Sequence, residues 1–122
     1  MSTILIVDDE KGLRRVLRDA LEAEGHAVLL AETAEEGLAR FEESACDLVL
    51  LDMILPDLNG LQVLRRMKQQ AADVPVIIMT AYSEVRGAVE AMKARAADYL
   101  CKPFDLDELK LVVQRILDSS AL

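Results

Sequence analysis

Short apolar runs alternate with longer segments of helical period along the chain. The runs are residues 4–7, 27–31, 48–51, 76–79 and 99–101, and apolar residues at helical spacing lie between them. This alternation is typical of a parallel β-sheet covered by helices. The first, third and fourth runs are apolar at every position, as expected of strands buried on both faces. The pattern predicts an α/β fold in which five strands and five helices alternate strictly.

The connections between these strands restrict their order in the sheet. Right-handed crossovers between parallel strands leave few topologies. We expect the flavodoxin-like order 2-1-3-4-5 of a doubly wound (βα)5 sheet, in which the first and third strands lie side by side. In such sheets ligands bind at the carboxyl ends of the strands, where the strand order reverses.

Capping signals indicate where helices begin and end. Gly25 can end the first helix in a left-handed turn. Thr33 with Glu36, and Asp105 with Glu108, have the spacing of a capping box, in which each side chain accepts a hydrogen bond from the other residue's backbone N–H. We therefore expect the second helix after Thr33 and the fifth helix after Asp105.

The apolar faces of the helices differ in strength. The first helix has its face at Leu13, Val16, Leu17, Ala20 and Leu21, and the fourth at Val85, Ala88, Val89 and Met92. Ser83 is placed to cap the fourth helix, and Gly87 inside it costs roughly 1 kcal/mol relative to Ala. Because switching elements come from the least stable parts of a fold, we interpret this helix as a candidate switch.

Polar residues follow four of the five predicted strands. Asp8 and Asp9 follow the first, and Asp52, Thr80 and Lys102 follow the third, fourth and fifth. Since parallel strands share one carboxyl edge, these three carboxylates, one hydroxyl and one ammonium are expected to converge. Taken alone, each aspartate or Thr80 could instead be a helix cap or a turn residue. All of them together at strand ends favour a common site.

The predicted cluster has the groups that phosphoryl transfer requires. Clustered carboxylates repel one another and need a compensating cation, and their hard oxygen atoms favour Mg²⁺. Asp52 stands alone after its strand and is the candidate nucleophile, since carboxylates attack phosphoryl groups to give aspartyl phosphates. Thr80 and Lys102, with Mg²⁺, would then stabilise the phosphoryl oxygens.

Composition and charge limit the number of domains, the cellular location and the partners that we expect. We expect a single domain over residues 1–122 with 14 basic and 22 acidic residues. The net charge of −8 argues against direct contact with nucleic acid, because phosphate binding needs clustered Lys and Arg. No apolar stretch approaches the roughly 20 residues that span a membrane, and no basic cleavable signal opens the chain, so we expect a cytoplasmic protein. Cys101 is interpreted as core packing and His26 as a surface residue at a strand start rather than a phosphoryl relay.

The residues at the strand ends resemble those of a known family. The sequence is similar to the receiver domain of two-component response regulators, and the likeness covers essentially the whole chain. It rests on Val7-Asp8-Asp9, Leu51-Asp52 with Leu55-Pro56 and Gly60, Met79-Thr80-Ala81, and Asp98-Tyr99-Leu100 with Lys102-Pro103-Phe104. The segments Thr80-Ala81-Tyr82 and Asp98 to Asp107 look most like receivers of nitrogen-regulator-type transcription activators. We therefore expect a domain cut from a longer regulator.

The resemblance implies a role for each site residue. Asp52 would accept a phosphoryl group from a sensor histidine kinase. Asp8, Asp9, Asp52 and the backbone carbonyl of Ile54 would hold Mg²⁺. Lys102 would pair with the phosphoryl group, and Thr80 would swing toward it. Tyr99 would turn inward behind Thr80. The Lys102-Pro103 bond would be cis. The surface of the fourth helix, fifth strand and fifth helix would pass the signal on, by homodimerisation or through an output domain.

One position departs from the family, and two other functions stay open. Arg95 stands where such receivers often have Gly, so a left-handed conformation there would cost roughly 1 kcal/mol. A Mg²⁺-dependent phosphohydrolase of the haloacid-dehalogenase type uses similar residues, but its nucleophile comes first in the chain, in a DxD motif. The third possible function is a receiver that signals without phosphate. The presence of all five site residues argues against it, namely Asp8, Asp9, Asp52, Thr80 and Lys102.

Overall fold

The elements of the structure alternate as the sequence predicts. The computed structural model describes residues 2–81 and 85–120, so the predicted cap at Ser83 lies outside the described residues. The strands are β1 (Thr3–Val7), β2 (Ala27–Ala31), β3 (Leu48–Asp52), β4 (Val76–Ala81) and β5 (Asp98–Lys102). The helices are α1 (Lys11–Ala23), α2 (Ala34–Glu43), α3 (Gly60–Gln70), α4 (Val85–Lys93) and α5 (Leu106–Ser120).

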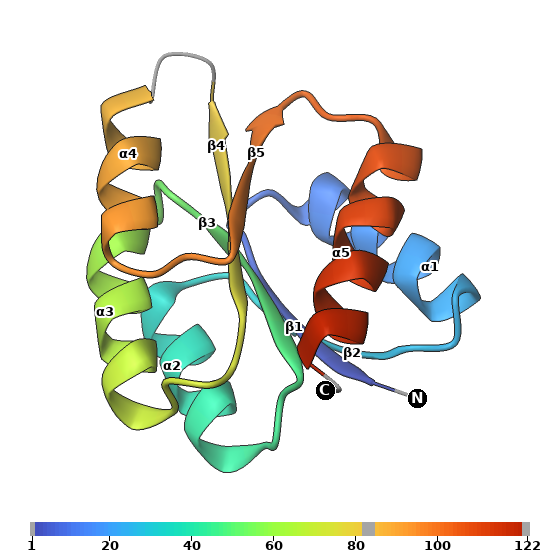
Figure 1. The fold of residues 1–122 in the computed structure, drawn as a ribbon, viewed down its shortest axis with the longest axis horizontal. Helices are drawn as coiled ribbons and strands as arrows, with labels where there is room; N and C mark the ends of the chain where they lie inside the picture. The colour runs from blue at the N-terminus through green and yellow to red at the C-terminus, as the bar shows by residue number, and fades with distance from the viewer. Residues whose placement is uncertain (1, 82–84, 121–122) are drawn as a thin grey trace.

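The strands form one parallel sheet in the order β2-β1-β3-β4-β5, which confirms the predicted topology. Helices α1 and α5 cover one face of the sheet, and α2, α3 and α4 cover the other (Figure 1). Alternate residues of β1 divide between the two cores: Leu5 and Val7 belong to one, Ile4 and Ile6 to the other. All four are fully buried, which explains why this strand is apolar throughout.

The register of the central strands sets the position of the functional edge. Val7 of β1 lies beside Leu51 of β3, and Asp52 lies beside Met79 of β4. The residues that follow Val7 and Leu51 therefore emerge next to each other at the carboxyl edge. This register brings Asp8 and Asp52 together although they lie 44 positions apart along the chain.

Helix caps agree with the sequence only in part. Thr33 Oγ1 accepts a hydrogen bond from Glu36 N at 3.1 Å, but the Glu36 side chain accepts from Glu32 rather than from Thr33. Asp105 likewise accepts from Asp107 N at 2.7 Å rather than from Glu108. Within the described residues, the predicted box at Thr33 therefore lacks its second half, and the predicted box at Asp105 lacks both halves. A complete capping box, formed by Asn59 and Gln62 at the start of α3, was not predicted.

Among residues 2–81 and 85–120, one glycine and one arginine adopt the left-handed backbone conformation. Gly25, just after α1, has φ of 92°, as its capping role requires. Arg95, after α4, has φ of 73°. The left-handed conformation considered for this position is therefore present, and an Arg bears its cost. The Lys102-Pro103 peptide bond is cis, as the resemblance implied.

The inward faces of α1 and α4 differ from the predicted ones. Leu17 and Leu21 of α1 are buried, whereas Val16 is 46% exposed. Among residues 87–93 of α4 the buried residues are Ala88 and Ala91, and the larger Val89 and Met92 are 50% and 43% exposed. Since each helical residue turns the chain by about 100°, a stripe through Ala88 and Ala91 leaves Val89 and Met92 outside. Helix α4 thus packs through small side chains.

The edge strand β5 is covered more completely on one face than on the other. Leu100 is buried in the core under α1 and α5, while Tyr99 and Cys101 point to the opposite face and are exposed. The prediction that Cys101 packs in the core is therefore wrong. Within the described residues, no helix has the length and apolar character needed to cross a membrane.

Candidate functional site

An ion-paired cluster occupies the carboxyl edge between β1, β3 and β5. Lys102 Nζ lies 2.8 Å from Asp8 Oδ2 and 3.3 Å from Asp52 Oδ1. Asp8 is completely buried and Asp52 is 7% exposed, so one ammonium is shared by two nearly water-free carboxylates. The residue types and strand ends were predicted from the sequence, and the structure brings these three side chains into contact.

Backbone N–H groups also donate hydrogen bonds to the two buried carboxylates. Glu10 N donates to Asp8 Oδ1 at 2.8 Å, and Ile54 N donates to Asp52 Oδ1 at 3.4 Å. Both oxygens of Asp8 are thus engaged. The second oxygen of Asp52 has no hydrogen-bond or ion-pair partner among residues 2–81 and 85–120. It is the oxygen best placed to react.

The surroundings of the cluster shift two pKa values. Burial, and next the neighbouring charge of Asp8, raise the pKa of Asp52 from 3.8 to about 6, despite the opposing effect of Lys102. For Lys102, burial lowers the pKa, but the hydrogen bond to Asp8 and the charges of both carboxylates outweigh it and leave the pKa raised. At neutral pH Asp52 is therefore mainly ionised and Lys102 is an ammonium, although the site holds excess negative charge.

The acidic residues fit a divalent cation with oxygen ligands. One carboxylate oxygen from each of Asp8, Asp9 and Asp52 lies within 4.8 Å of the others. Asp9 is exposed, so the cluster is open to solvent on one side. Hard carboxylate ligands beside an open position that waters and phosphate oxygens can fill suit Mg²⁺. Ile54, the predicted carbonyl ligand, lies in the loop after β3, where it forms a bridge with Asn59 and is 58% exposed.

Within the described residues, the two switch candidates, Thr80 and Tyr99, make no hydrogen bond to the ion-paired cluster. Thr80 is 1% exposed at the end of β4, and its Oγ1 donates to Ala81 O at 3.3 Å. This bond is long, so the hydroxyl is weakly held. Tyr99 is 42% exposed and points outward in this structure, and its inward turn behind Thr80, which the resemblance implies, stays a prediction.

Asp57 is a residue near the site whose contacts the sequence did not reveal. It lies in the loop between β3 and α3, and its two oxygens accept hydrogen bonds from Ala34 N at 2.8 Å and Glu35 N at 2.9 Å, at the start of α2. These bonds lower its pKa. Because the partners are more than 20 residues away, the local signal of a Pro-Asp turn could not identify them. Asp57 ties the loop that follows Asp52 to a neighbouring helix.

The Asp57 contacts should make stability depend on pH. A carboxyl whose pKa is lowered by folding stabilises the protein above its unfolded pKa, near 4, and loses this contribution as the pH falls through the folded pKa. Asp57→Asn should therefore lower the free energy of unfolding at pH 7, and the difference from wild type should shrink in acid. Urea unfolding at several pH values measures this. The exposed Glu42, changed to Gln, is the control, and a difference that grows in acid would contradict the assignment.

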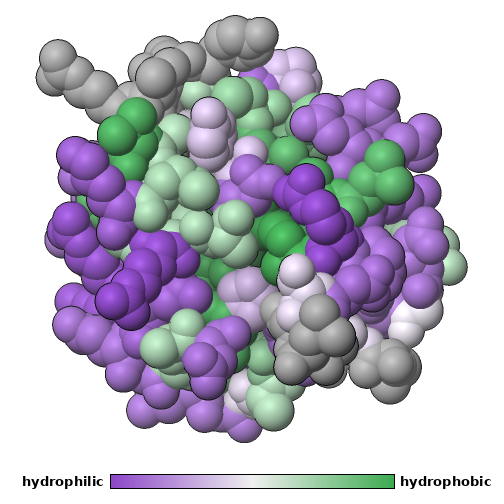
Figure 2. All heavy atoms as spheres, viewed as in Figure 1, coloured by the Kyte–Doolittle hydropathy of each residue, from purple (hydrophilic) through white to green (hydrophobic). Residues whose placement is uncertain are grey.

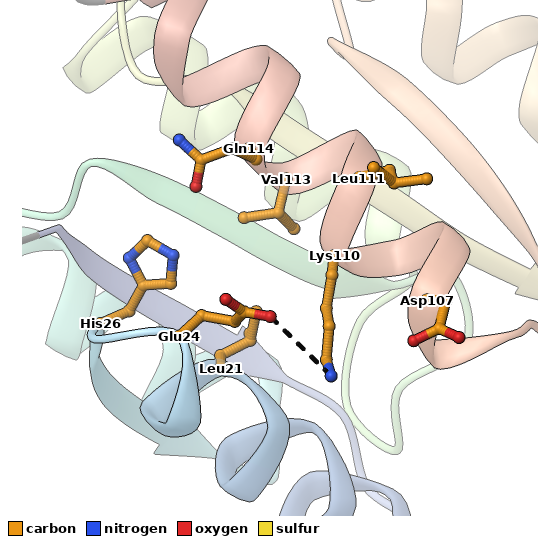
Figure 3. A pocket seen from close by; sticks show the side chains of 8 residues that line it. All are labelled: Leu21, Glu24, His26, Asp107, Lys110, Leu111, Val113 and Gln114. Carbon is orange, nitrogen blue, oxygen red and sulfur yellow. Dashed lines mark ion pairs between the residues drawn. The ribbon is translucent and has the colours of Figure 1, made fainter.

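A pocket of about 410 Å³ lies away from the acidic edge, between α1 and α5 (Figure 3). Lys110 Nζ and Glu24 Oε1 approach to 3.8 Å across it. His26 lines this pocket and has a buried Nδ1 without a hydrogen-bond partner among the described residues, so it is less exposed than expected. His26 precedes the amino end of β2, whereas Asp52 lies at the carboxyl end of β3, so the two residues are at opposite edges of the parallel sheet. This placement argues against a phosphoryl relay.

The strand order and the acidic carboxyl edge define a flavodoxin-like α/β domain. The family model of the response regulator receiver domain matches residues 4–114. The chain therefore belongs to the response regulator receiver family, as the sequence motifs suggested. Receivers are signalling domains rather than conventional enzymes, and this membership favours the receiver over the phosphohydrolase.

Relatives and solved structures agree with this assignment. AtoC, a regulatory protein of Escherichia coli K12, is 43% identical over 122 residues, which is 100% of this chain and 26% of AtoC. The CheY-like receiver domain protein of Methanospirillum hungatei has a TM-score of 0.96 at 32% identity, covering 99% of this chain and 97% of that one. NtrX of Brucella abortus has a TM-score of 0.93 at 36% identity, over 98% of this chain and 28% of NtrX. The chain thus spans about a quarter of AtoC and NtrX, whose likeness confirms the kinship with nitrogen-regulator-type activators.

Proposed function

We propose that this domain is a phosphorylation switch in which Asp52 accepts a phosphoryl group from a sensor histidine kinase in a Mg²⁺-dependent reaction. The observation that carries the proposal is the shared ion pair of Lys102 with Asp8 and Asp52 at the carboxyl edge. This ion pair supports a site whose carboxylates outnumber its cations and which can therefore bind a metal ion and then a phosphoryl group. Receivers of this family act with histidine kinases, so the phosphodonor is a phosphohistidine.

Different residues of the cluster bind the metal ion, attack the phosphoryl group and stabilise it. Asp8, Asp9 and Asp52, with the Ile54 carbonyl, would hold Mg²⁺, which when bound neutralises carboxylate and phosphoryl oxygens. The free oxygen of Asp52 attacks phosphorus, the phosphorus–nitrogen bond of the donor breaks, and the imidazole leaves with its electron pair. Because the pKa of Asp52 is about 6, the nucleophile is ionised at neutral pH. Lys102 then pairs with the phosphoryl group, and the weakly held Thr80 hydroxyl turns to donate to it.

An apolar groove beside the acceptor suits the kinase. A groove of about 340 Å³ adjoins Lys102 and is lined by Glu10, Leu13, Val16, Lys102, Pro103, Phe104 and Leu106. The exposure of Val16, unexpected from the helical pattern, places an apolar side chain at its rim. We propose that the kinase docks here, because a partner seated in this groove lies next to the Asp52 carboxylate.

The surface of α4, β5 and α5 is the proposed output surface. Val89, Met92 and Tyr99 are exposed on α4 and β5, and apolar residues gather over the middle of the face that Figure 2 shows, where these elements meet. Thr80 lies at the end of β4, beside Cys101 of β5, so a turn of its hydroxyl toward phosphate acts next to this surface. The curated relatives are longer regulators, and we propose that this domain serves as the receiver of such a protein.

Intact-mass spectrometry tests the phosphorylation. After incubation with Mg²⁺ and acetyl phosphate, we expect one phosphoryl adduct, which disappears when Mg²⁺ is chelated and in Asp52→Ala. Asp73→Asn, which removes an exposed carboxylate far from the cluster, should keep the adduct. Rapid hydrolysis of many phosphate esters, or an adduct that persists in Asp52→Ala, would overturn the proposal.

Light scattering tests the output surface. The phosphorylated domain should dimerise, and Val89→Lys, which puts a charge into the apolar surface, should weaken the dimer at least about tenfold without preventing phosphorylation. Val16→Lys makes the same change at a similarly exposed site on α1 and should leave the dimer intact when the protein is phosphorylated with acetyl phosphate, without a kinase. A phosphorylated wild type that stays monomeric, or equal dimerisation of both variants, would show that this surface does not mediate dimerisation.

A further inference from the structure

We propose that Arg14 of α1 is a positioning residue that orients the two consecutive aspartates of the metal site. This inference rests on the proposed function, since it concerns how the same site binds its cation. Arg14 Nη1 donates to the backbone carbonyl of Asp8 at 2.6 Å, and Arg14 Nη2 lies 3.5 Å from Glu32 Oε2. Only 12% of the Arg14 side chain is exposed, so its guanidinium is held between these two partners.

The carbonyl that Arg14 binds belongs to the peptide that joins Asp8 to Asp9. This peptide is planar, so a hydrogen bond that fixes its oxygen also fixes the N–H and the Cα position of Asp9. The other side of Asp8 is held as well, because Asp8 N donates to Ala31 O at 3.0 Å. Arg14 therefore supplies the second of two backbone anchors at this turn.

The two aspartates depend on this anchor to different degrees. The Asp8 side chain is locked by Lys102 and by Glu10 N, at 2.8 Å each. The Asp9 side chain is exposed and has no hydrogen bond or ion pair to the part of the chain that the structure describes. Its position relative to Asp8 is therefore set by the backbone, which Arg14 holds.

Positioning and simple charge predict opposite effects of removing Arg14. A cation beside an acidic site repels Mg²⁺, so loss of its charge alone would strengthen binding. Loss of an outer partner that orients the ligands would weaken metal binding, typically 10- to 100-fold. The sign of the change therefore distinguishes the two roles.

Isothermal titration of the full chain with MgCl₂ provides the test. We expect Arg14→Ala to raise the dissociation constant for Mg²⁺ about tenfold. Arg15→Ala removes the same charge from the neighbouring, exposed position and should leave the constant unchanged or slightly lower. Arg14→Lys, which keeps the charge and one donor, should recover part of the affinity. Titrations are run at a temperature at which thermal unfolding shows every variant folded.

A second readout needs no metal. In NMR spectra of the metal-free protein, the amides of Asp9 and Glu10 should shift and exchange faster in Arg14→Ala but not in Arg15→Ala. Unchanged amides, or Mg²⁺ binding by Arg14→Ala as tight as by Arg15→Ala, would overturn the inference. A wild type that binds Mg²⁺ but takes up no phosphoryl group would instead overturn the proposed function and leave the role of Arg14 standing.

Discussion

Replacing Asp52 by Asn should raise the free energy of unfolding of the metal-free protein by about 2 to 3 kcal/mol above pH 7. Folding raises the pKa of Asp52 from 3.8 to about 6, chiefly through burial, so the ionised carboxylate destabilises the folded state. The loss of folding stability caused by the ionised Asp52 carboxylate is absent below pH 4, grows as the pH rises toward 6 and is complete above pH 6. Asn has no charge to bury and escapes this cost.

Urea unfolding in the presence of a chelator, from pH 4 to pH 8, measures the effect. The advantage of Asp52→Asn should vanish at pH 4, and Asp73→Asn should show no comparable gain at any pH. Added Mg²⁺ should stabilise the wild type more than the variant, because a ligand that binds only the folded state adds to its stability. A variant less stable than the wild type at pH 8 would show that the ion pairs with Lys102 outweigh the burial of charge.

Replacing Gly60 by Ala should lower the free energy of unfolding by about 3 kcal/mol and impair phosphorylation. Gly60 N donates to Met53 O at 2.6 Å, so the first turn of α3 lies directly against the end of β3. A Cβ at Gly60 would clash with the carbonyl oxygen of Asp52 and would come within 2.7 Å of Met53 Cα. Both obstacles are backbone, so the segment that holds the acceptor must move.

Gly12→Ala is the matched control for this substitution. Gly12 lies in the first turn of α1, and a Cβ there meets no atom within 4 Å. Ala in that helix should therefore stabilise the protein by up to about 1 kcal/mol. Chemical unfolding and intact-mass spectrometry of both variants give the comparison. If Gly60→Ala is as stable as the wild type and is phosphorylated normally, the close approach of α3 to β3 is not needed.

The sequence predicted the sheet and its acidic edge because both depend on strongly patterned strands. The runs in β1, β3 and β4 are apolar throughout since both faces are buried, which marked them as central strands. Right-handed crossovers then left few strand orders, and the expected one brings Asp8 next to Asp52. Lys102 could be assigned to the same edge because β5 ends there. The strand ends thus carried most of the information about the site.

Contacts between distant segments, and choices between helix faces, could not be predicted in this way. Asp57 and Arg14 act through backbone atoms, whose positions no residue type reveals. In α4 the small Ala88 and Ala91 face inward while Met92 is exposed, which a rule that buries the largest apolar residues cannot detect. The capping boxes failed because backbone donors nearby in space competed for the Glu36 and Asp105 side chains.

Chemical trapping tests most directly whether the phosphoryl group resides on Asp52. Borohydride reduces an aspartyl phosphate to homoserine, which marks the modified residue permanently. After treatment with Mg²⁺ and acetyl phosphate, reduction and peptide mass spectrometry, we expect homoserine at position 52 and aspartate at positions 8 and 9. Homoserine at position 8 or 9, or an unmodified Asp52 in a protein that carries a phosphoryl adduct, would contradict the account.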